Sequence, residues 1–327
     1  MSQPLPRNLD QALDRVETRF ETLYSWNYDT QREDLRSLYE KAKHGQWDGQ
    51  KDLNWSIDVD PEAENTPDQQ IAIYGTDMWK KLNDRDVKHL RHEFTSWTLS
   101  QFLHGEQGGL LATAQIVDAV PWIDAKYYAA TQVMDEARHV EVYDKYLRDK
   151  VELEYPVNPH LKKLLDLILA DSRWDMKYLG MQIMVEGLAL AAFNFMHTFS
   201  KEPLIKDLTK HVMLDEARHV AFGVMSLRGL YNDMSEKEFK ERQDFAYEAC
   251  VLMRDRFDGL EVWQKMGLDV DRCLELSLNS PAMREFRKML FSKIVPNLKR
   301  IGLLTGDLRN RFQELDILKF ENWEASA

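Results

Sequence analysis

The hexapeptide DEARHV occurs twice in this chain of 327 residues, at residues 135–140 and 215–220. Apolar runs recur easily in helical proteins because many amphipathic helices share the same spacing. A run that keeps two acids, an arginine and a histidine in the same order is far more restrictive. The repeat therefore predicts two copies of one structural unit, each built around the same charged side chains.

The similarity extends beyond the hexapeptide at the same offset of 80 residues. Each half holds a glutamate followed 30 residues later by Glu-x-x-His, and the corresponding residues are Glu106 and Glu186, Glu136 and Glu216, His139 and His219. The gap fits one helix, a short turn at Pro121 or Pro203, and a returning antiparallel helix. Residues three apart share a helical face, so the Glu and His of each motif point the same way.

Four helices that offer Glu, Glu-x-x-His, Glu and Glu-x-x-His match the ligand set of dimetal sites in bundle cores. Four anionic carboxylates largely balance the charge of two di- or trivalent cations, and each imidazole holds one cation. We therefore predict an all-α fold, a four-helix bundle with additional N- and C-terminal helices. The predicted metal ligands are Glu106, Glu136, His139, Glu186, Glu216 and His219.

The alternative for one such motif is a solvated helix face. The surroundings of Glu186 argue against it, because this glutamate interrupts the apolar run GMQIMVEGLALAAFNF. An unpaired carboxylate is costly to bury in such a run. Glu106 is likewise followed by GGLLATA. The apolar residues around both glutamates therefore favour a buried site in which positively charged groups balance the carboxylates.

Asp135 and Asp215 precede the motif glutamates. Carboxylates in such positions commonly accept the free N–H of metal-bound histidines, and we assign both aspartates this supporting role. Arg138 and Arg218 would then hold the aspartates in place and temper the negative charge. Surface pairing at i,i+3 is an equally good reading for the two arginines.

The organisation expected from helical spacing is one helical domain over residues 1–327. Its four-helix core spans about 85–231, with flanking helical segments at 8–45 and 235–319. The first segment ends at His44-Gly45, and 46–68 forms an irregular connection. The segment 235–319 opens with SEKE, a capping box, and breaks at Gly267, Ser280-Pro281 and Pro296. Scarce glycine (14) and proline (10) fit long helices.

Composition narrows the function classes. A net charge of −12 argues against a nucleic-acid partner, which requires a basic face. Two cysteines cannot form a disulfide framework and fit a cytoplasmic location. The polar N-terminus lacks a signal peptide, and no stretch reads as a membrane span.

With these motifs, the chain resembles the ferritin-like di-iron carboxylate superfamily. The D-E-x-R-H form of both motifs is similar to the oxygen-activating branch, which includes bacterial multicomponent monooxygenase hydroxylases, acyl-carrier-protein desaturases and arylamine N-oxygenases. The resemblance covers about 85–231. It implies two iron ions, with a Mn/Fe pair also open, and dioxygen as co-substrate.

At three positions, the residue of this chain can be compared with the residue that is typical of a particular family. The hydroxylases typically have a threonine four residues after the third Glu ligand, where this chain has Leu190. The arylamine N-oxygenases add a histidine four residues before the last motif glutamate, where this chain has Val212, with His211 one step away. Ribonucleotide reductase small subunits, which the chain also resembles, have a radical tyrosine four residues after the first motif histidine, and Tyr143 stands there. Ordinary helix packing explains Tyr143 as well.

The resemblance implies an oxidoreductase that activates dioxygen and acts on a small organic substrate beside Glu106 and Glu186. Electrons would come from an external reductase or ferredoxin, because the chain has no flavin or nicotinamide fingerprint. The alternatives are a radical-generating subunit, with Tyr143 as a redox residue, and a ferroxidase. We also expect a homodimer. Five small residues near the two glutamates suggest open space, although close helix packing explains them equally well: Gly105, Gly108, Gly109, Gly187 and Ala189.

Overall fold

The computed structural model describes residues 13–19 and 21–323, and no strand occurs among them. The segments up to the last bundle helix are α1 (Glu33–His44), η2 (Asp68–Gln70), η3 (Trp79–Lys81), α2 (Asp84–Ala119), α3 (Ile123–Tyr146), η4 (Leu147–Val151), α4 (Pro159–Ala170), α5 (Trp174–Tyr178), η5 (Leu179–Val185), α6 (Glu186–Phe199) and α7 (Pro203–Leu227). The later segments are η6 (Leu230–Asp233), α8 (Glu236–Asp255), α9 (Leu260–Lys265), α10 (Val270–Asn279), α11 (Pro281–Leu290), α12 (Ile294–Arg300), α13 (Gly306–Glu314) and η7 (Leu318–Phe320).

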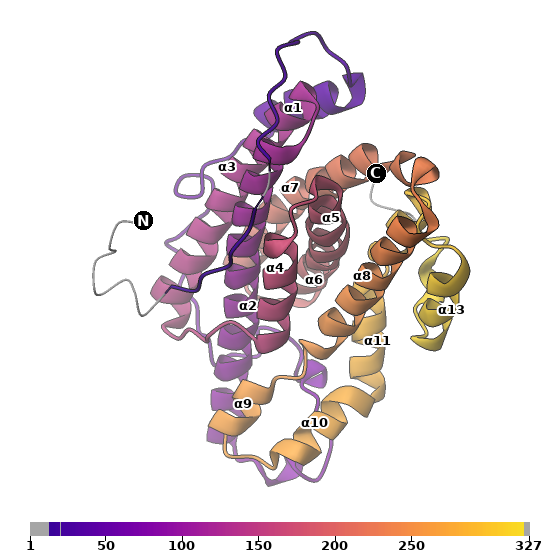
Figure 1. The fold of residues 1–327 in the computed structure, drawn as a ribbon. Helices are drawn as coiled ribbons and strands as arrows, with labels where there is room; N and C mark the ends of the chain where they lie inside the picture. The colour runs from indigo at the N-terminus through magenta and orange to yellow at the C-terminus, as the bar shows by residue number, and fades with distance from the viewer. Residues whose placement is uncertain (1–12, 20, 324–327) are drawn as a thin grey trace.

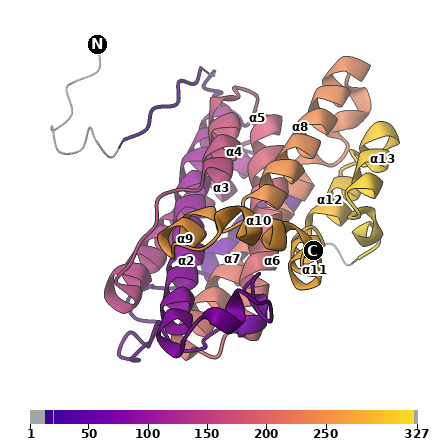
Figure 2. The same ribbon diagram turned by 90° about the horizontal axis from the view of Figure 1, so that it is seen from below.

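The centre of the molecule is a bundle of α2, α3, α6 and α7, in which α2 packs along α3 and α6 packs along α7 (Figure 1). The α2–α3 connection contains Pro121, and α7 begins at Pro203. Both hairpins of the predicted repeat are therefore present. Around this core, α1 packs on α3 and α7, whereas α8 packs on α4 and η5. The last helices, α11, α12 and α13, lie together at one side of the bundle (Figure 2).

Local sequence signals account for several helix starts. Asn83 caps α2 by accepting hydrogen bonds from the backbone N–H groups of Arg85 and Asp86. Ser235 and Glu238 form the predicted capping box of α8. Proline opens α4, α7 and α11, where its missing N–H costs nothing.

The expected helix over residues 8–45 is wrong for most of its described length, because among the described residues of this range only Glu33–His44 is helical. Residues 13–19 and 21–32 are irregular, and 1–12 and 20 lie outside the described residues. Polar side chains compete with helical hydrogen bonds here: the Asn27 side chain accepts from the Asp29 N–H, and Ser25 donates to the Asn27 carbonyl. This segment instead docks on α3, with Asp124 accepting from the N–H groups of Gln31 and Arg32.

Two other boundaries differ from expectation. An unpredicted break at 171–173 separates α4 from α5. Pro296 does not break a helix but lies in the first turn of α12. Backbone N–H groups of a first turn have no intrahelical acceptor, so proline is tolerated there.

The helical segment Trp174–Phe199 is long and apolar enough to cross a membrane by length and composition alone, contrary to the expectation that no stretch would pass. Within its most apolar window, 78% of the residues are buried. The core helix of a bundle meets the same criteria. This segment supplies one of the four bundle helices.

Asp124 is the main attachment point of the N-terminal segment, because its buried carboxylate also pairs with Arg36 at 2.7 Å. We predict that Asp124→Ala lowers the free energy of unfolding by about 2–4 kcal/mol, since it removes the buried charged acceptor of three part-buried hydrogen bonds. Urea unfolding followed by circular dichroism measures this change. The control Asp34→Ala removes an exposed carboxylate and should cost less than about 1 kcal/mol. Equal losses in both variants would contradict the prediction.

Candidate metal centre

The structure brings all six predicted ligand side chains together in the centre of the bundle. They come from four helices: Glu106 from α2, Glu136 and His139 from α3, Glu186 from the first position of α6, and Glu216 and His219 from α7. All six are buried, and none is more than 5% exposed. Residues far apart in sequence therefore form one enclosed polar cluster.

The cluster divides into two groups whose ligand atoms each lie within 4.8 Å of one another. One group is Glu106, Glu136, His139 and Glu216, and the other is Glu136, Glu186, Glu216 and His219. Glu136 and Glu216 belong to both groups. The geometry therefore offers two adjacent cation positions with two shared carboxylates, one terminal carboxylate each and one imidazole each.

Both imidazoles present Nδ1 to the carboxylates. His139 Nδ1 lies 3.2 Å from Glu106 Oε2 and 3.3 Å from Glu216 Oε1. His219 Nδ1 lies 3.3 Å from Glu136 Oε1 and 3.4 Å from Glu216 Oε2. The same ring nitrogen is thus available to a cation in each half.

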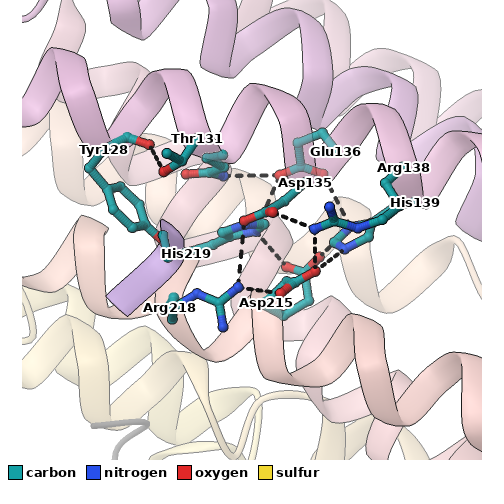
Figure 3. A network of polar contacts seen from close by, with 12 residues as sticks. Tyr128, Thr131, Asp135, Glu136, Arg138, His139, Asp215, Arg218 and His219 are labelled. Carbon is teal, nitrogen blue, oxygen red and sulfur yellow. Dashed lines mark hydrogen bonds and ion pairs between the residues drawn. The ribbon is translucent and has the colours of Figure 1, made fainter. Parts of the chain in front are cut away.

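The other ring nitrogens make a crossed pair of contacts (Figure 3). His139 Nε2 lies 3.1 Å from Asp215 Oδ2, and His219 Nε2 lies 3.4 Å from Asp135 Oδ2. Each aspartate therefore supports the histidine of the other repeat, not the one in its own motif. This exchange fixes the ring orientation of both histidines and joins α3 to α7 directly.

The two arginines lie with the aspartates and not on an exposed helix face. Arg138 donates to Asp135 Oδ1 at 2.5 Å and to Asp215 Oδ2 at 3.1 Å. Arg218 pairs with Asp215 and lies 3.6 Å from Asp135 Oδ2. Two guanidinium groups therefore neutralise the two carboxylates that support the histidines (Figure 3).

Burial and mutual repulsion perturb the ionisation of the cluster. Burial raises the pKa of Glu106 to about 8, and it raises the pKa of Glu186 well above the usual range, with repulsion from Glu136 and Glu216 adding to the effect. Burial alone would lower the pKa of His219, but the carboxylates of Glu216 and Glu136 raise it to about 10. The negative charge of the clustered carboxylates therefore favours the binding of cations.

The donor set fits two cations. Glu136 Oε2, both carboxylate oxygens of Glu216 and His219 Nδ1 are buried and lack a hydrogen-bond partner among the described residues. Ionised carboxylates have no proton to donate, so facing oxygens cannot satisfy one another. Oxygen and imidazole nitrogen ligands suit iron and manganese, and a mixture of both is typical of non-haem iron sites.

Four further polar residues contact the cluster or its support, and the repeat did not predict them. Gln132 donates to Glu136 Oε1 at 3.0 Å, and Gln182 donates to Gln132 Oε1 at 3.3 Å. From the segment after α1, Gln46 donates to Asp135 and Trp47 donates to Asp215 at 2.7 Å. Gln132 lies four residues before Glu136 on the same helical face, which could have identified it. Gln46 and Trp47 carry no such signal.

The small residues near the ligands have different roles. A Cβ on Gly109 would lie 2.9 Å from Glu136 Oε2, one on Gly108 would collide with Leu165, and one on Gly187 would approach Ile294 at 3.1 Å. These three glycines permit close packing, so the expectation of open space beside them is wrong. Gly105 has no atom within 4 Å of its Cβ position.

Gly105 lines a pocket that reaches the cluster from one side. The lining residues are Gln101, Phe102, Gly105, Glu106, Val185, Glu186, Leu188, Ala189, Phe193 and Arg256. Among the six clustered side chains, only Glu106 and Glu186 contribute to it. The pocket therefore meets the cluster through the two carboxylates that the cation positions do not share.

The remaining predicted positions lie near the cluster without joining it. Tyr143 is fully buried, its ring packs against Phe102 and Phe193, which also contact each other, and its hydroxyl has no hydrogen-bond partner among the described residues. Val212 is buried, and the His211 ring packs against Trp47 at 4.9 Å. Within 13–19 and 21–323, no third histidine joins the cluster.

Comparison with known proteins assigns a family to this arrangement. The family model described as p-aminobenzoate N-oxygenase AurF matches residues 29–302. The chain belongs to the AurF family. Membership confirms the prediction of a ferritin-like di-iron protein and of an oxidoreductase that uses dioxygen, and the buried carboxylate and histidine cluster of this AurF-family chain fits the predicted dimetal cofactor. No curated protein matches it in sequence.

Solved structures share the fold of this AurF-family protein. An R2-like ligand-binding oxidase with an aerobically reconstituted metal cofactor is 17% identical, with a TM-score of 0.57, and the match covers 85% of this chain and 95% of the oxidase. A variant with a reconstituted Fe/Fe cofactor gives 17% identity and a TM-score of 0.56 over 85% and 95% of the two chains. Another variant, with a Mn/Fe cofactor, aligns equally well. These similarities confirm the all-α, ferritin-like fold.

The contact between Gly109 and Glu136 gives a direct test of the cluster. We predict that Gly109→Ala displaces the Glu136 carboxylate and weakens iron binding by about tenfold or more. Gly105→Ala adds the same methyl group in the same helix, but into open space, and should retain iron. Ferrous titration under anaerobic conditions measures the affinity, and thermal unfolding checks the fold. Unchanged affinity in Gly109→Ala would contradict the assigned geometry.

Proposed function

We propose that the protein is a dioxygen-activating dimetal oxygenase that acts on a small organic substrate. The observation that carries this proposal is a pair of buried cation positions with shared carboxylates, of whose side chains Glu106 and Glu186 line a pocket. A structural metal site needs no such access. A site that must admit dioxygen and a substrate does.

In this proposal, the six clustered side chains are the metal ligands. Two bound iron ions, or a Mn/Fe pair, would supply the electrons and the Lewis acidity that dioxygen activation requires. Glu136 and Glu216 would hold both cations, and the imidazoles of His139 and His219 would hold one each. Glu106 would complete the coordination beside the pocket, together with Glu186.

The surrounding residues have supporting tasks. Asp135 and Asp215 hold the N–H groups of the histidines, so that each Nδ1 stays directed at a cation. Arg138 and Arg218 pair with these aspartates and hold them in place. On the pocket side, Phe102 and other apolar side chains exclude bulk water from the reacting atoms.

Family membership favours oxygen transfer to an amine nitrogen over hydroxylation of carbon, because the AurF family is described as an N-oxygenase. The proposed centre differs from that of the arylamine N-oxygenases at Val212, which cannot ligate a metal. Six protein ligands would therefore hold the cations here. The Gln132 amide, one repeat earlier at the corresponding position, instead donates to Glu136.

Electrons would come from a separate reductase or ferredoxin. Cys250 and Cys273 are both free and buried, which agrees with the proposed cytoplasmic location. We also propose a homodimer as the working assembly.

The proposed function predicts the metal stoichiometry of two variants. Glu216 belongs to both cation positions, so Glu216→Ala should remove both iron ions from the two that we expect per chain. Glu106 belongs to one position, so Glu106→Ala should retain about one ion at moderate iron concentration. Metal analysis after anaerobic ferrous loading and desalting distinguishes these outcomes. Full occupancy in Glu216→Ala, or storage of hundreds of ions per particle as in a ferroxidase, would overturn the proposal.

A further prediction separates an oxygenase from a radical-generating subunit. Tyr143 is sheltered as a stable radical requires, but oxidation of a phenol also needs an acceptor for its proton, and none of the described residues accepts a hydrogen bond from Tyr143. We expect no lasting tyrosyl radical after reduced protein meets dioxygen, and we expect Tyr143→Phe to retain more than about half of dioxygen consumption. Electron paramagnetic resonance and an oxygen electrode measure the two quantities. A stoichiometric tyrosyl signal that Tyr143→Phe abolishes would favour the radical subunit.

A further inference from the structure

Two buried glutamines form a chain of hydrogen bonds that ends on the cluster. Gln132 from α3 and Gln182 from η5 are both fully buried. Gln132 Nε2 lies 3.0 Å from Glu136 Oε1 and 3.5 Å from Glu186 Oε1. Gln182 Nε2 lies 3.3 Å from Gln132 Oε1. An ionised carboxylate can only accept hydrogen bonds, so Gln132 must donate to the cluster and Gln182 must donate to Gln132.

The oxygen atoms that Gln132 contacts belong to one of the two cation positions. Each position is named here after its imidazole, the His139 position and the His219 position. Glu136 Oε1 lies 3.3 Å from His219 Nδ1, whereas Glu136 Oε2 faces His139 Nδ1 at 3.6 Å. Glu186 belongs only to the group that contains His219. Both contacts of the Gln132 amide nitrogen are therefore made to oxygen atoms of the His219 position.

The His139 position has no equivalent of this chain. At the offset of the repeat, Val212 corresponds to Gln132, and Phe102 corresponds to Gln182. Both are buried, and neither side chain can donate a hydrogen bond. The carboxylate oxygens of Glu216, which Val212 precedes by one helical turn, have no hydrogen-bond partner among the described residues. Two positions that correspond in the repeat thus differ in the side chains that support them.

Core packing by itself does not account for a glutamine at position 182. A Cβ on Gly223 would lie 2.5 Å from Gln182 Cβ, so a glycine is needed for α7 to approach η5 this closely. Within this contact, Gln182 Oε1 is buried and lacks a hydrogen-bond partner among the described residues. A buried polar atom without a partner is unfavourable, and an apolar side chain of the same length would avoid that cost. The hydrogen bond from Gln182 to Gln132 is therefore the feature that requires an amide here.

We propose that Gln132 and Gln182 are positioning residues of the His219 position alone. The proposal rests on the proposed function, in that the clustered side chains are taken as metal ligands. Gln132 would hold Glu136 Oε1 and the Glu186 carboxylate in the orientation that a cation requires, and Gln182 would fix the Gln132 amide. Side chains that orient metal ligands commonly account for about 10–100-fold in metal affinity. Loss of the amide chain should therefore weaken one of the two bound ions and not the other.

The experiment measures ferrous binding under anaerobic conditions by calorimetric titration of Gln132→Met, which keeps the length of the side chain and removes the amide. We expect one ion to bind about tenfold or more weakly than in the wild-type protein, and the other ion to bind as before. Gln243→Met is the control, because Gln243 is a buried glutamine of α8 that donates to backbone carbonyls away from the cluster. It should retain both affinities. Thermal unfolding of the metal-free variants measures the loss of packing in each.

Two further backgrounds show which ion is weakened. Glu106→Ala leaves the His219 position as the complete one, so adding Gln132→Met should weaken the remaining ion by the same factor. Glu186→Ala leaves the His139 position as the complete one, so adding Gln132→Met should not change the remaining affinity. A purely structural role of Gln132 would lower stability without distinguishing the two backgrounds.

A double-variant cycle tests the link between the two glutamines. Gln182 acts through Gln132, so Gln182→Met should weaken the same ion by a smaller factor and should add nothing to the loss in Gln132→Met. Equal weakening of both ions in Gln132→Met, no weakening of either ion, or a weakened His139 position would overturn the proposal. Additive losses in the double variant would overturn the role of Gln182. A wild-type protein that fails to load two ions would instead refute the proposed function.

Discussion

Four carboxylates buried within a few ångströms of one another are the constraint around which the rest of this protein is organised. Burial and repulsion both oppose their ionisation, as the raised pKa of Glu106 and Glu186 indicates. Protonation of the carboxylates, imidazolium groups or bound cations can offset this cost. A four-helix bundle suits the task, because it presents one acidic side chain from each helix to a common centre.

The crossed contacts between aspartates and histidines make the two repeats depend on each other. Asp215 supports His139 and Asp135 supports His219, so neither half could orient its own imidazole alone. Arg138 adds a bond between the halves by pairing with both aspartates. Trp47, which follows α1, closes this network from outside the bundle. The N-terminal segment is therefore part of the support of the centre and not a separate appendage.

The two faces of the cluster differ in character. On one face, aspartates and arginines fill the space and hold the imidazoles by direct hydrogen bonds. On the other, Glu106 and Glu186 border a pocket with apolar walls, to which the end of α8 contributes Arg256. This asymmetry separates the residues that position the centre from those that a substrate can reach.

The sequence by itself determined the helical hairpins and the six clustered side chains. The repeat at an offset of 80 residues is visible in the order of the residues, and the i,i+3 spacing places Glu and His on one helical face. It misassigned residues 13–32, where Asn27 and Ser25 divert backbone hydrogen bonds and the segment docks on Asp124. Which histidine each aspartate supports, whether Gly109 makes space or contact, and where Arg256 points were decided only by the tertiary structure. These relations depend on how separate helices approach one another in space, and no periodicity within a single helix encodes that.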